Sequence, residues 1–339
     1  MAKLTPLSKI YKLIEKSQNP LIFFDDDPDG LCSYLLIKKH FRKGHPVLVK
    51  SSPKLDATYI GKVNEYSPDL ILVLDKPKLT QDFIDKANVP VIYIDHHPIN
   101  DIKGVHYFNP LMKDEKDDRP VSYWCYKLTK DNLWIGTVGT AADYSLATIK
   151  QFHKKFPDLL KYRDKPSDVL YKTELGRLIR IFSFILQHPH YKALQYVNLM
   201  EKIESPYELL EASSDNAREI LKIYEKVNKR YQALLERALP VQKSKVHVFV
   251  HSDSKLGFRA DLSSELQYMF KDKLILVGKR TEDVIRMSLR YQNGDLNKLM
   301  QKAFEGLEGS GGGHMHACGG IIKSKDFDEF VRRLESYIK

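Results

Sequence analysis

Three short apolar segments of the sequence, LIFF, LILVL and VIYI, lead directly into Asp25, Asp75 and Asp95. In an open parallel sheet, ligands bind at the carboxyl ends of the strands, so three such strands would bring three carboxylates to one edge. Carboxylates that lie this close repel one another, and a bound cation relieves the repulsion. A single aspartate at a strand end is typical of a turn. Three in one domain indicate a metal site.

The first aspartate begins the segment DDDPDG, in which the alternate residues Asp25, Asp27 and Asp29 can converge on one point. A glycine follows and permits a sharp turn into the next element. An EF-hand loop begins in a similar way, but its twelfth position requires a bidentate glutamate. That position is Leu36 here, so we exclude a calcium loop.

The third aspartate, Asp95, is followed by His96 and His97. A set of carboxylate and imidazole ligands suits Mn²⁺ or another first-row metal better than Ca²⁺. Adjacent histidines at a strand end point in different directions, so one can bind metal while the other faces substrate. Alone, the triplet would be typical of a surface or capping histidine pair. A fourth acid, Asp143, follows a run of small residues that would allow the backbone to approach a crowded site.

The elements that must position these residues follow from the hydrophobic pattern. Between residues 20 and 145, short apolar runs alternate with amphipathic stretches, which predicts a parallel sheet covered by helices. Between 150 and 240 the strand signals vanish and apolar residues recur at helical spacing. Strands return from Lys245 onward. We therefore predict an α/β protein with a parallel-sheet domain at 1–150, a helical connector at 151–242 and a smaller α/β domain at 243–339.

Composition narrows the class of protein. The chain has 339 residues, of which 42% are hydrophobic and 29% charged, and these values exclude a disordered chain. No apolar run approaches the roughly 18 residues of a membrane span, and the N-terminus has no signal-peptide pattern. We expect a cytoplasmic protein without a membrane partner. The net charge of +10 favours a polyanionic partner, although lysine-rich solubility would explain it equally well.

The N-terminal part resembles the DHH phosphoesterase superfamily, which is named for the triplet seen here at 95–97. The family has four acidic motifs, and their counterparts are DDDPDG at 25–30, Asp75, the triplet, and Asp143. Many members have His where Asp25 stands, but RecJ nucleases have Asp. The C-terminal part resembles the DHHA1 domain that accompanies this core, through GGGH at 311–314 and the turn Ala317–Gly320. The combination is similar to RecJ-like nucleases and nanoRNase-like enzymes.

This resemblance implies that two divalent ions, Mn²⁺ or alternatively Mg²⁺, share Asp75 and activate a water that attacks phosphorus. Asp95 would orient a histidine, and His97 would contact the scissile phosphate, which makes these two the candidate catalytic residues. The implied metal ligands are Asp25, Asp27, Asp29, Asp75, His96 and Asp143. Beside the shared Asp75, the resemblance implies Asp25 and Asp27 as ligands of the first ion and Asp29, His96 and Asp143 as ligands of the second.

The DHHA1 resemblance implies that the glycine run binds substrate through backbone N–H groups. A flexible linker is the alternative, but a strand and a helix follow the run, which favours a functional loop. The implied substrate-binding residues are Ser288, Arg290, Gly311, Gly312, Gly313 and His314. Tyr291 is a further candidate, for stacking on a base, although an ordinary surface position would explain it equally well.

Together these features predict a metal-dependent exonuclease or oligonucleotide phosphodiesterase acting on single-stranded DNA, RNA or short oligonucleotides. A cyclic-dinucleotide or nucleotide phosphatase on the same scaffold is an alternative. A scaffold that docks on replication or repair proteins is another, which the retained ligand residues disfavour. DNA against RNA, polarity, preferred metal and oligomeric state stay open.

Overall fold

The computed structural model describes residues 4–50, 54–161, 164–240, 243–252 and 257–338. The chain forms two compact units, Met1–Lys226 and Val227–Lys339, each with its own sheet. Helix α12 (Asp215–Ala238) carries the chain from the first unit to the second. Within the described ranges, we find no helix with the length and apolarity needed to cross a bilayer.

The first unit is built on a five-stranded sheet in the order β2-β1-β4-β6-β7, with every neighbouring pair parallel. This confirms the predicted parallel sheet. The register pairs Phe24 with Leu74 and Leu74 with Ile94, so the carboxyl ends of β1, β4 and β6 lie side by side. The strands are β1 (Pro20–Asp25), β2 (His45–Val49), β4 (Leu70–Leu74), β6 (Val91–Ile94) and β7 (Val105–Phe108).

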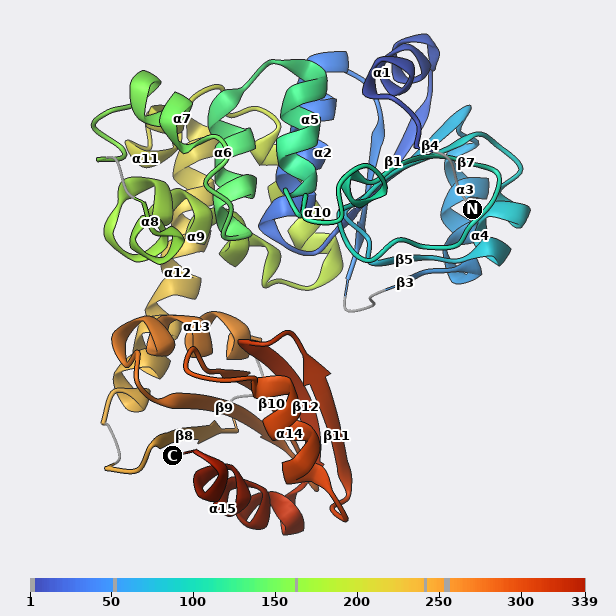
Figure 1. The fold of residues 1–339 in the computed structure, drawn as a ribbon. Coiled ribbons are helices and arrows are strands. Elements are labelled where there is room, and N and C mark those ends of the chain that lie inside the picture. Colours follow the sequence, from blue (N-terminus) through green and yellow to red (C-terminus); the bar gives the residue numbers. More distant parts are fainter. Residues whose placement is uncertain (1–3, 51–53, 162–163, 241–242, 253–256, 339) are drawn as a thin grey trace. The chain divides into compact units, whose positions relative to one another are not determined.

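Helices cover both faces of this sheet (Figure 1). Consecutive residues of β1 show the two faces: Phe23 meets Phe83 edge to face, and Phe24 stacks on Tyr34 at 4.8 Å. Burial of both faces explains why the strands are continuous apolar runs rather than alternating patterns. One face carries α3 (Ile60–Tyr66) and α4 (Gln81–Ala87); the other carries α2 (Pro28–Phe41), which packs with α5 (Val121–Thr129) and α6 (Leu133–Ala142).

Other elements of the first unit flank this core. As predicted, the described residues between 149 and 238 form helices without a strand. Helix α9 is the most buried of them and packs on α6 and α8. The remaining elements are α1 (Leu7–Lys16), β3 (Lys54–Leu55), β5 (Lys78–Leu79), α7 (Ile149–Lys155), α8 (Pro166–Lys172), α9 (Glu174–Leu186), α10 (His190–Met200) and α11 (Pro206–Leu210).

The second unit has a mixed sheet in the order β11-β12-β10-β9-β8, in which only the β8–β9 pair is parallel. Its apolar core includes Met287 and Leu289 of β10, Met300 of α14 and Phe330 of α15. The elements are β8 (Val246–His251), α13 (Arg259–Met269), β9 (Leu274–Thr281), β10 (Val284–Arg290), α14 (Leu296–Phe304), β11 (Gly309–Gly313), β12 (Ala317–Lys323) and α15 (Phe327–Tyr337).

The glycine run corrects one expectation. We predicted a loop, but Gly309–Gly313 is the edge strand β11, antiparallel to β12. The glycines have a packing reason: a Cβ on Gly311 would lie 2.6 Å from the Met300 methyl and 2.7 Å from the Gly319 carbonyl oxygen. Glycine is a poor strand former by itself, so pairing with β12 and contact with α14 must stabilise this strand.

Gly30 supplies a test of how tightly the acidic segment is held. A Cβ there would lie 2.6 Å from the carbonyl oxygen and 2.7 Å from the amide nitrogen of Asp25, and backbone atoms cannot move aside. We expect Gly30→Ala to lower the free energy of unfolding by about 1–3 kcal/mol, as overpacking does. The matched control is Gly61→Ala in α3, where nothing lies within 4 Å of the added carbon. Equal melting temperatures for the two variants would contradict this reading.

Candidate metal centre

The three strand-end aspartates meet at one edge of the first sheet. Asp25 is the last residue of β1, and Asp75 and Asp95 directly follow β4 and β6. Both of the latter side chains are buried. Asp75 is in the left-handed region with φ of 59°, so the chain turns sharply as soon as β4 ends. Its amide donates to the Ile94 carbonyl at 3.0 Å, which ties this turn to β6.

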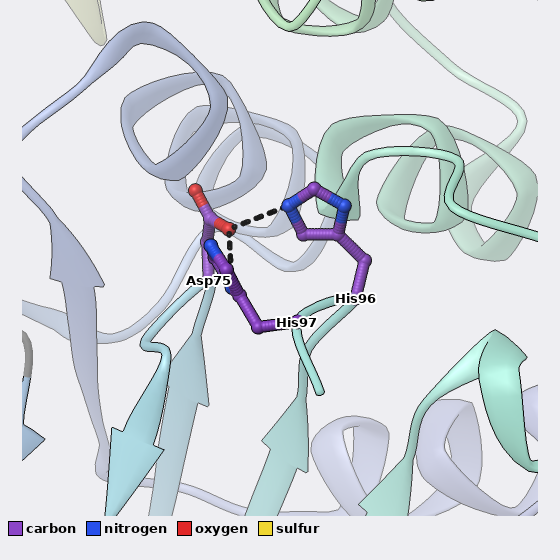
Figure 2. Close-up of side chains that lie close together, drawn as sticks. All are labelled: Asp75, His96 and His97. Carbon is purple, nitrogen blue, oxygen red and sulfur yellow. Dashed lines mark ion pairs between the residues drawn. The ribbon is translucent and has the colours of Figure 1, made fainter. Parts of the chain in front are cut away.

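Figure 2 shows a ring nitrogen of His96, Nε2, facing the Asp75 carboxylate. Its Nε2 lies 3.5 Å from Asp75 Oδ1 and 3.4 Å from Asp143 Oδ2. Its Nδ1 lies 3.0 Å from the backbone carbonyl oxygen of Asp118, which can only accept, so Nδ1 carries the proton. In the neutral ring Nε2 therefore has its lone pair facing the cluster, which is the arrangement of a metal-binding histidine.

His97 is held differently, by the buried carboxylate of Asp95. The Nδ1 of His97 lies 2.8 Å from Asp95 Oδ1 and 3.9 Å from Asp75 Oδ1. Burial lowers the pKa of His97, but the hydrogen bond and the charge of Asp95 outweigh it, so the pKa is raised. The Asn109 side-chain amide donates to the His97 carbonyl and fixes the backbone at this point. Both histidines thus lie near Asp75, but the nearest carboxylate of His97 is Asp95, whereas His96 lies beside Asp143.

Two aspartates of the first motif cap helices. Asp27 begins α2, and its Oδ1 accepts from the Gly30 amide at 2.8 Å. Asp29 is buried, and its two oxygens accept from the amides of Val121 and Ser122 at 2.8 and 2.9 Å, at the start of α5. The sequence predicts Asp29 only as a metal ligand. This carboxylate also fixes α5, with which α6, the helix preceding Asp143, packs.

The structure brings together two sets of ligand atoms, each within 4.8 Å of one another. One set is Asp75, His96 and His97; the other is Asp29, His96 and Asp143. The predicted ligands Asp25 and Asp27 lie in neither set. The Asp25 Oδ1 accepts from the Lys76 ammonium at 2.6 Å. Lys76 is a residue of this edge that no motif in the sequence indicates.

Crowding changes the acidity of the cluster. Burial, together with Asp29 and other neighbouring carboxylates, raises the pKa of Asp27 and Asp75 well above the usual range. Burial and Asp29 raise the pKa of Asp143 to about 6, against the opposing effect of His96. Within the described part of the chain, the buried oxygens Asp75 Oδ1 and Asp95 Oδ2 have no hydrogen-bond partner. A buried carboxylate oxygen beside an imidazole lone pair fits a divalent cation such as Mn²⁺.

The predicted substrate-binding residues lie in the second unit. Ser288 pairs with Gly319, and Gly319 pairs with Gly312, so the three form one row across the sheet. Arg290, two residues along β10 from Ser288, donates from Nε to Ser264 Oγ at 3.0 Å. His314 follows β11 and is exposed. The role of these residues in substrate binding stays a prediction.

Tyr291 corrects the expectation of a stacking aromatic. Its side chain is only 7% exposed and belongs to the apolar core of the second unit. Its backbone amide donates to the His316 carbonyl at 3.1 Å, and its carbonyl oxygen lies 3.0 Å from the His316 ring. Side chains alternate along a strand, and Tyr291 continues the inward-facing row of Met287 and Leu289 in β10.

The geometry defines a class of two-unit proteins. The first unit has a parallel sheet with carboxylates and imidazoles at its carboxyl edge, and the second has a mixed sheet. A model of the DHH family N-terminal domain matches residues 19–156, and a model of the DHHA1 domain matches residues 243–339. Together they match well over half of the chain. The chain belongs to the DHH phosphoesterase superfamily, whose members are typically phosphoester hydrolases. No curated protein matches this sequence.

Solved structures share the fold at low sequence identity. RecJ from Thermus thermophilus in complex with Mn²⁺ matches with a TM-score of 0.69 and 17% identity, over 99% of this chain and 55% of that one. This chain thus spans about half the length of that RecJ. Exonuclease RecJ bound to manganese matches with a TM-score of 0.65 and 18% identity, over 99% of this chain and 95% of that one. The Vibrio pGpG-specific phosphodiesterase PggH matches with a TM-score of 0.50 and 12% identity, over 95% of this chain and 99% of that one.

The variant Asp75→Asn tests whether the carboxylates of the acidic cluster repel one another. Asparagine removes the charge of Asp75 and tolerates the left-handed backbone. A carboxyl whose pKa is raised on folding favours the folded state below its unfolded pKa and loses that contribution as pH rises. We expect the variant, in EDTA at pH 7.5, to melt about 2–4 °C above wild type, equivalent to about 1 kcal/mol. At pH 5 the gain should be smaller, because the raised pKa of Asp75 increasingly favours its uncharged form as the pH falls. A lower melting temperature at both pH values would contradict the repulsion.

Substitution of His96 and of His97 should have different effects on metal affinity. His96→Ala removes the imidazole whose lone pair faces Asp75 and Asp143, and we expect Mn²⁺ affinity to fall by more than about 10-fold. His97→Ala should change Mn²⁺ affinity less and reduce turnover more, because Asp95 directs this ring separately. Calorimetric titration of Mn²⁺ into both variants checks this. Equal loss of affinity would show that the two roles are wrongly divided.

Proposed function

We propose that this protein is a metal-dependent phosphodiesterase that hydrolyses single-stranded nucleic acid or short oligonucleotides. The observation that carries the proposal is the convergence of Asp75, His96 and Asp143 around a site where the carboxyl pKa values are raised. Such a site favours a bound cation over carboxylates without a counter-charge. The shared fold with a manganese-bound RecJ exonuclease supports the same chemistry.

A divalent cation, when bound, stabilises charge on phosphate oxygens and lowers the pKa of water next to it. Asp75, His96 and Asp143 would hold it, and the chain's other groups would position the substrate. Asp95 holds the proton on Nδ1 of His97, and the raised pKa of this ring favours a second proton on Nε2. That N–H can donate to an oxygen of the scissile phosphate and stabilise charge as it develops.

We assign the second unit to substrate binding. Ser288 and Arg290 supply a hydroxyl and a guanidinium on one face of β10, and Gly312 and Gly319 continue the row without side chains that would block a ligand backbone. The exposed imidazole of His314 adjoins β11. A net charge of +10 agrees with a polyphosphate ligand, because cationic protein surface releases counterions from nucleic acid.

The fold of the pGpG-specific phosphodiesterase PggH favours a second candidate substrate class, dinucleotides. The same centre would hydrolyse either substrate, so length preference is what separates the two. Retention of both histidines and of the acids makes a scaffold role without catalysis the weaker reading.

The function is tested with end-labelled DNA and RNA oligomers of graded length, incubated with Mn²⁺ or Mg²⁺ and resolved by size. We expect metal-dependent release of mononucleotides or short products by wild type and none by Asp75→Asn. Polarity, sugar preference and length preference follow from the same gels. A folded, metal-loaded wild type that leaves every oligomer and pGpG intact would contradict the proposal.

The substrate-binding role is tested by Gly312→Val. A Cβ at this position meets only Asn297 Oδ1, at 3.2 Å, so the sheet should tolerate the change while the surface becomes bulkier. We expect kcat/KM for an oligonucleotide to fall about 10-fold, or about 1.4 kcal/mol, with turnover of bis-p-nitrophenyl phosphate within about 2-fold of wild type. The control is Ser310→Val, two residues earlier on the same face of β11. An unchanged oligonucleotide kcat/KM in Gly312→Val would remove this strand from the site.

A further inference from the structure

Lys76 is a fully buried lysine at the acidic edge of the first sheet. Its side chain has no exposed surface, and its Nζ lies 2.6 Å from Asp25 Oδ1. Lysine is almost never fully buried unless it is paired. It directly follows Asp75, and the hydroxyl of Tyr93 donates to its carbonyl oxygen, so the backbone that carries it is held by β6. The lysine is part of the built edge of the sheet.

A second lysine, Lys50, pairs with Asp26, the residue next to Asp25, and comparison with it shows what is unusual about Lys76. Lys50 binds both oxygens of Asp26 at 3.0 Å, but its side chain is 20% exposed and can reach water. Lys50 pairs with an aspartate that is not among the ligands implied by the family resemblance. Lys76 pairs with Asp25, which the resemblance assigns to the first of two ions. The buried lysine therefore occupies the end of the cluster where that ion is expected.

The acids of the cluster show why a fixed positive charge is stable there. Asp25 ends β1 and Asp75 directly follows β4, the strand paired with β1, so both carboxylates lie at the same edge of the sheet. The Lys76 ammonium on Asp25 Oδ1 offsets the negative charge of Asp25, so that this carboxylate needs no bound metal ion. Burying a lysine is costly unless a carboxylate compensates the charge, and the distance of 2.6 Å supplies that compensation.

We propose that the Lys76 ammonium replaces one of the two divalent ions, so that this centre binds a single divalent ion, held by Asp75, His96 and Asp143. A second dication sharing Asp25 would lie beside an ammonium that cannot withdraw into solvent, and the like charges would repel. The inference rests on the proposed function only in that the centre binds a divalent cation. It concerns the number of ions and the role of Asp25, and it requires no hydrolysis.

The test is the Mn²⁺ content of the full chain, measured by equilibrium dialysis with elemental analysis and by electron paramagnetic resonance. We expect one tightly bound Mn²⁺ per wild-type chain, with the spectrum of an isolated ion. Lys76→Met removes the charge but keeps the length of the side chain, and we expect a second Mn²⁺ with a spin-coupled spectrum. The matched control is Lys50→Met, which should keep one ion. Two ions in wild type, or one ion in a folded Lys76→Met, would overturn the proposal.

Asp25→Asn provides a second arm that stays informative if Lys76→Met fails to fold. If Lys76 rather than an ion satisfies Asp25, this nearly isosteric variant should still bind one Mn²⁺, with a dissociation constant within about 3-fold of wild type. Loss of an ion from Asp25→Asn would make Asp25 a ligand and overturn the proposal. One bound ion without oligonucleotide hydrolysis would contradict the proposed function alone. No bound ion in wild type would contradict both.

Discussion

Repulsion among carboxylates at the carboxyl edge of one parallel sheet is the constraint to which the rest of the first unit responds. Burial raises the pKa of Asp27 and Asp75 and leaves two carboxylate oxygens without hydrogen-bond partners in the described structure. A fold would not retain such a cluster for stability, because protonated or uncharged residues would cost less. The cluster is therefore a candidate site for a positively charged ligand.

The surrounding elements limit the repulsion without abolishing it. Each acid is held by a different group: the Gly30 amide binds Asp27, the first amides of α5 bind Asp29, and the Lys76 ammonium binds Asp25. These contacts hold the carboxylates in place before any ligand arrives. Ligands that are held in place in this way need little rearrangement when a cation binds, which lowers the cost of binding.

Much of this site could be predicted from the sequence because its signals are local. Apolar runs that end in aspartate mark strand ends, and the triplet Asp95–His97 stands directly after one of them. The parallel order of the strands then brings the acids to a single edge. Strand β7 was not predicted, since it is only four residues long. Helix α1 was not predicted either, although its buried residues Ile10 and Ile14 recur at helical spacing.

The remainder depends on contacts between residues far apart in the chain. Asp29 caps a helix that begins 92 residues later, and nothing near Asp29 in the sequence signals it. Lys76 is one of 54 basic residues, and only the three-dimensional structure shows that it is buried against Asp25. The strand β11 has the composition of a linker, and it forms because β12 pairs with it.

The central claim is that the acidic edge holds a divalent cation between β4, β6 and the end of α6. Anomalous diffraction at the manganese edge, from crystals of the full chain grown with Mn²⁺, tests it most directly. The account predicts one strong peak within bonding distance of Asp75, His96 and Asp143, with the Lys76 ammonium still on Asp25. A fully occupied manganese elsewhere and no peak at this edge would contradict it.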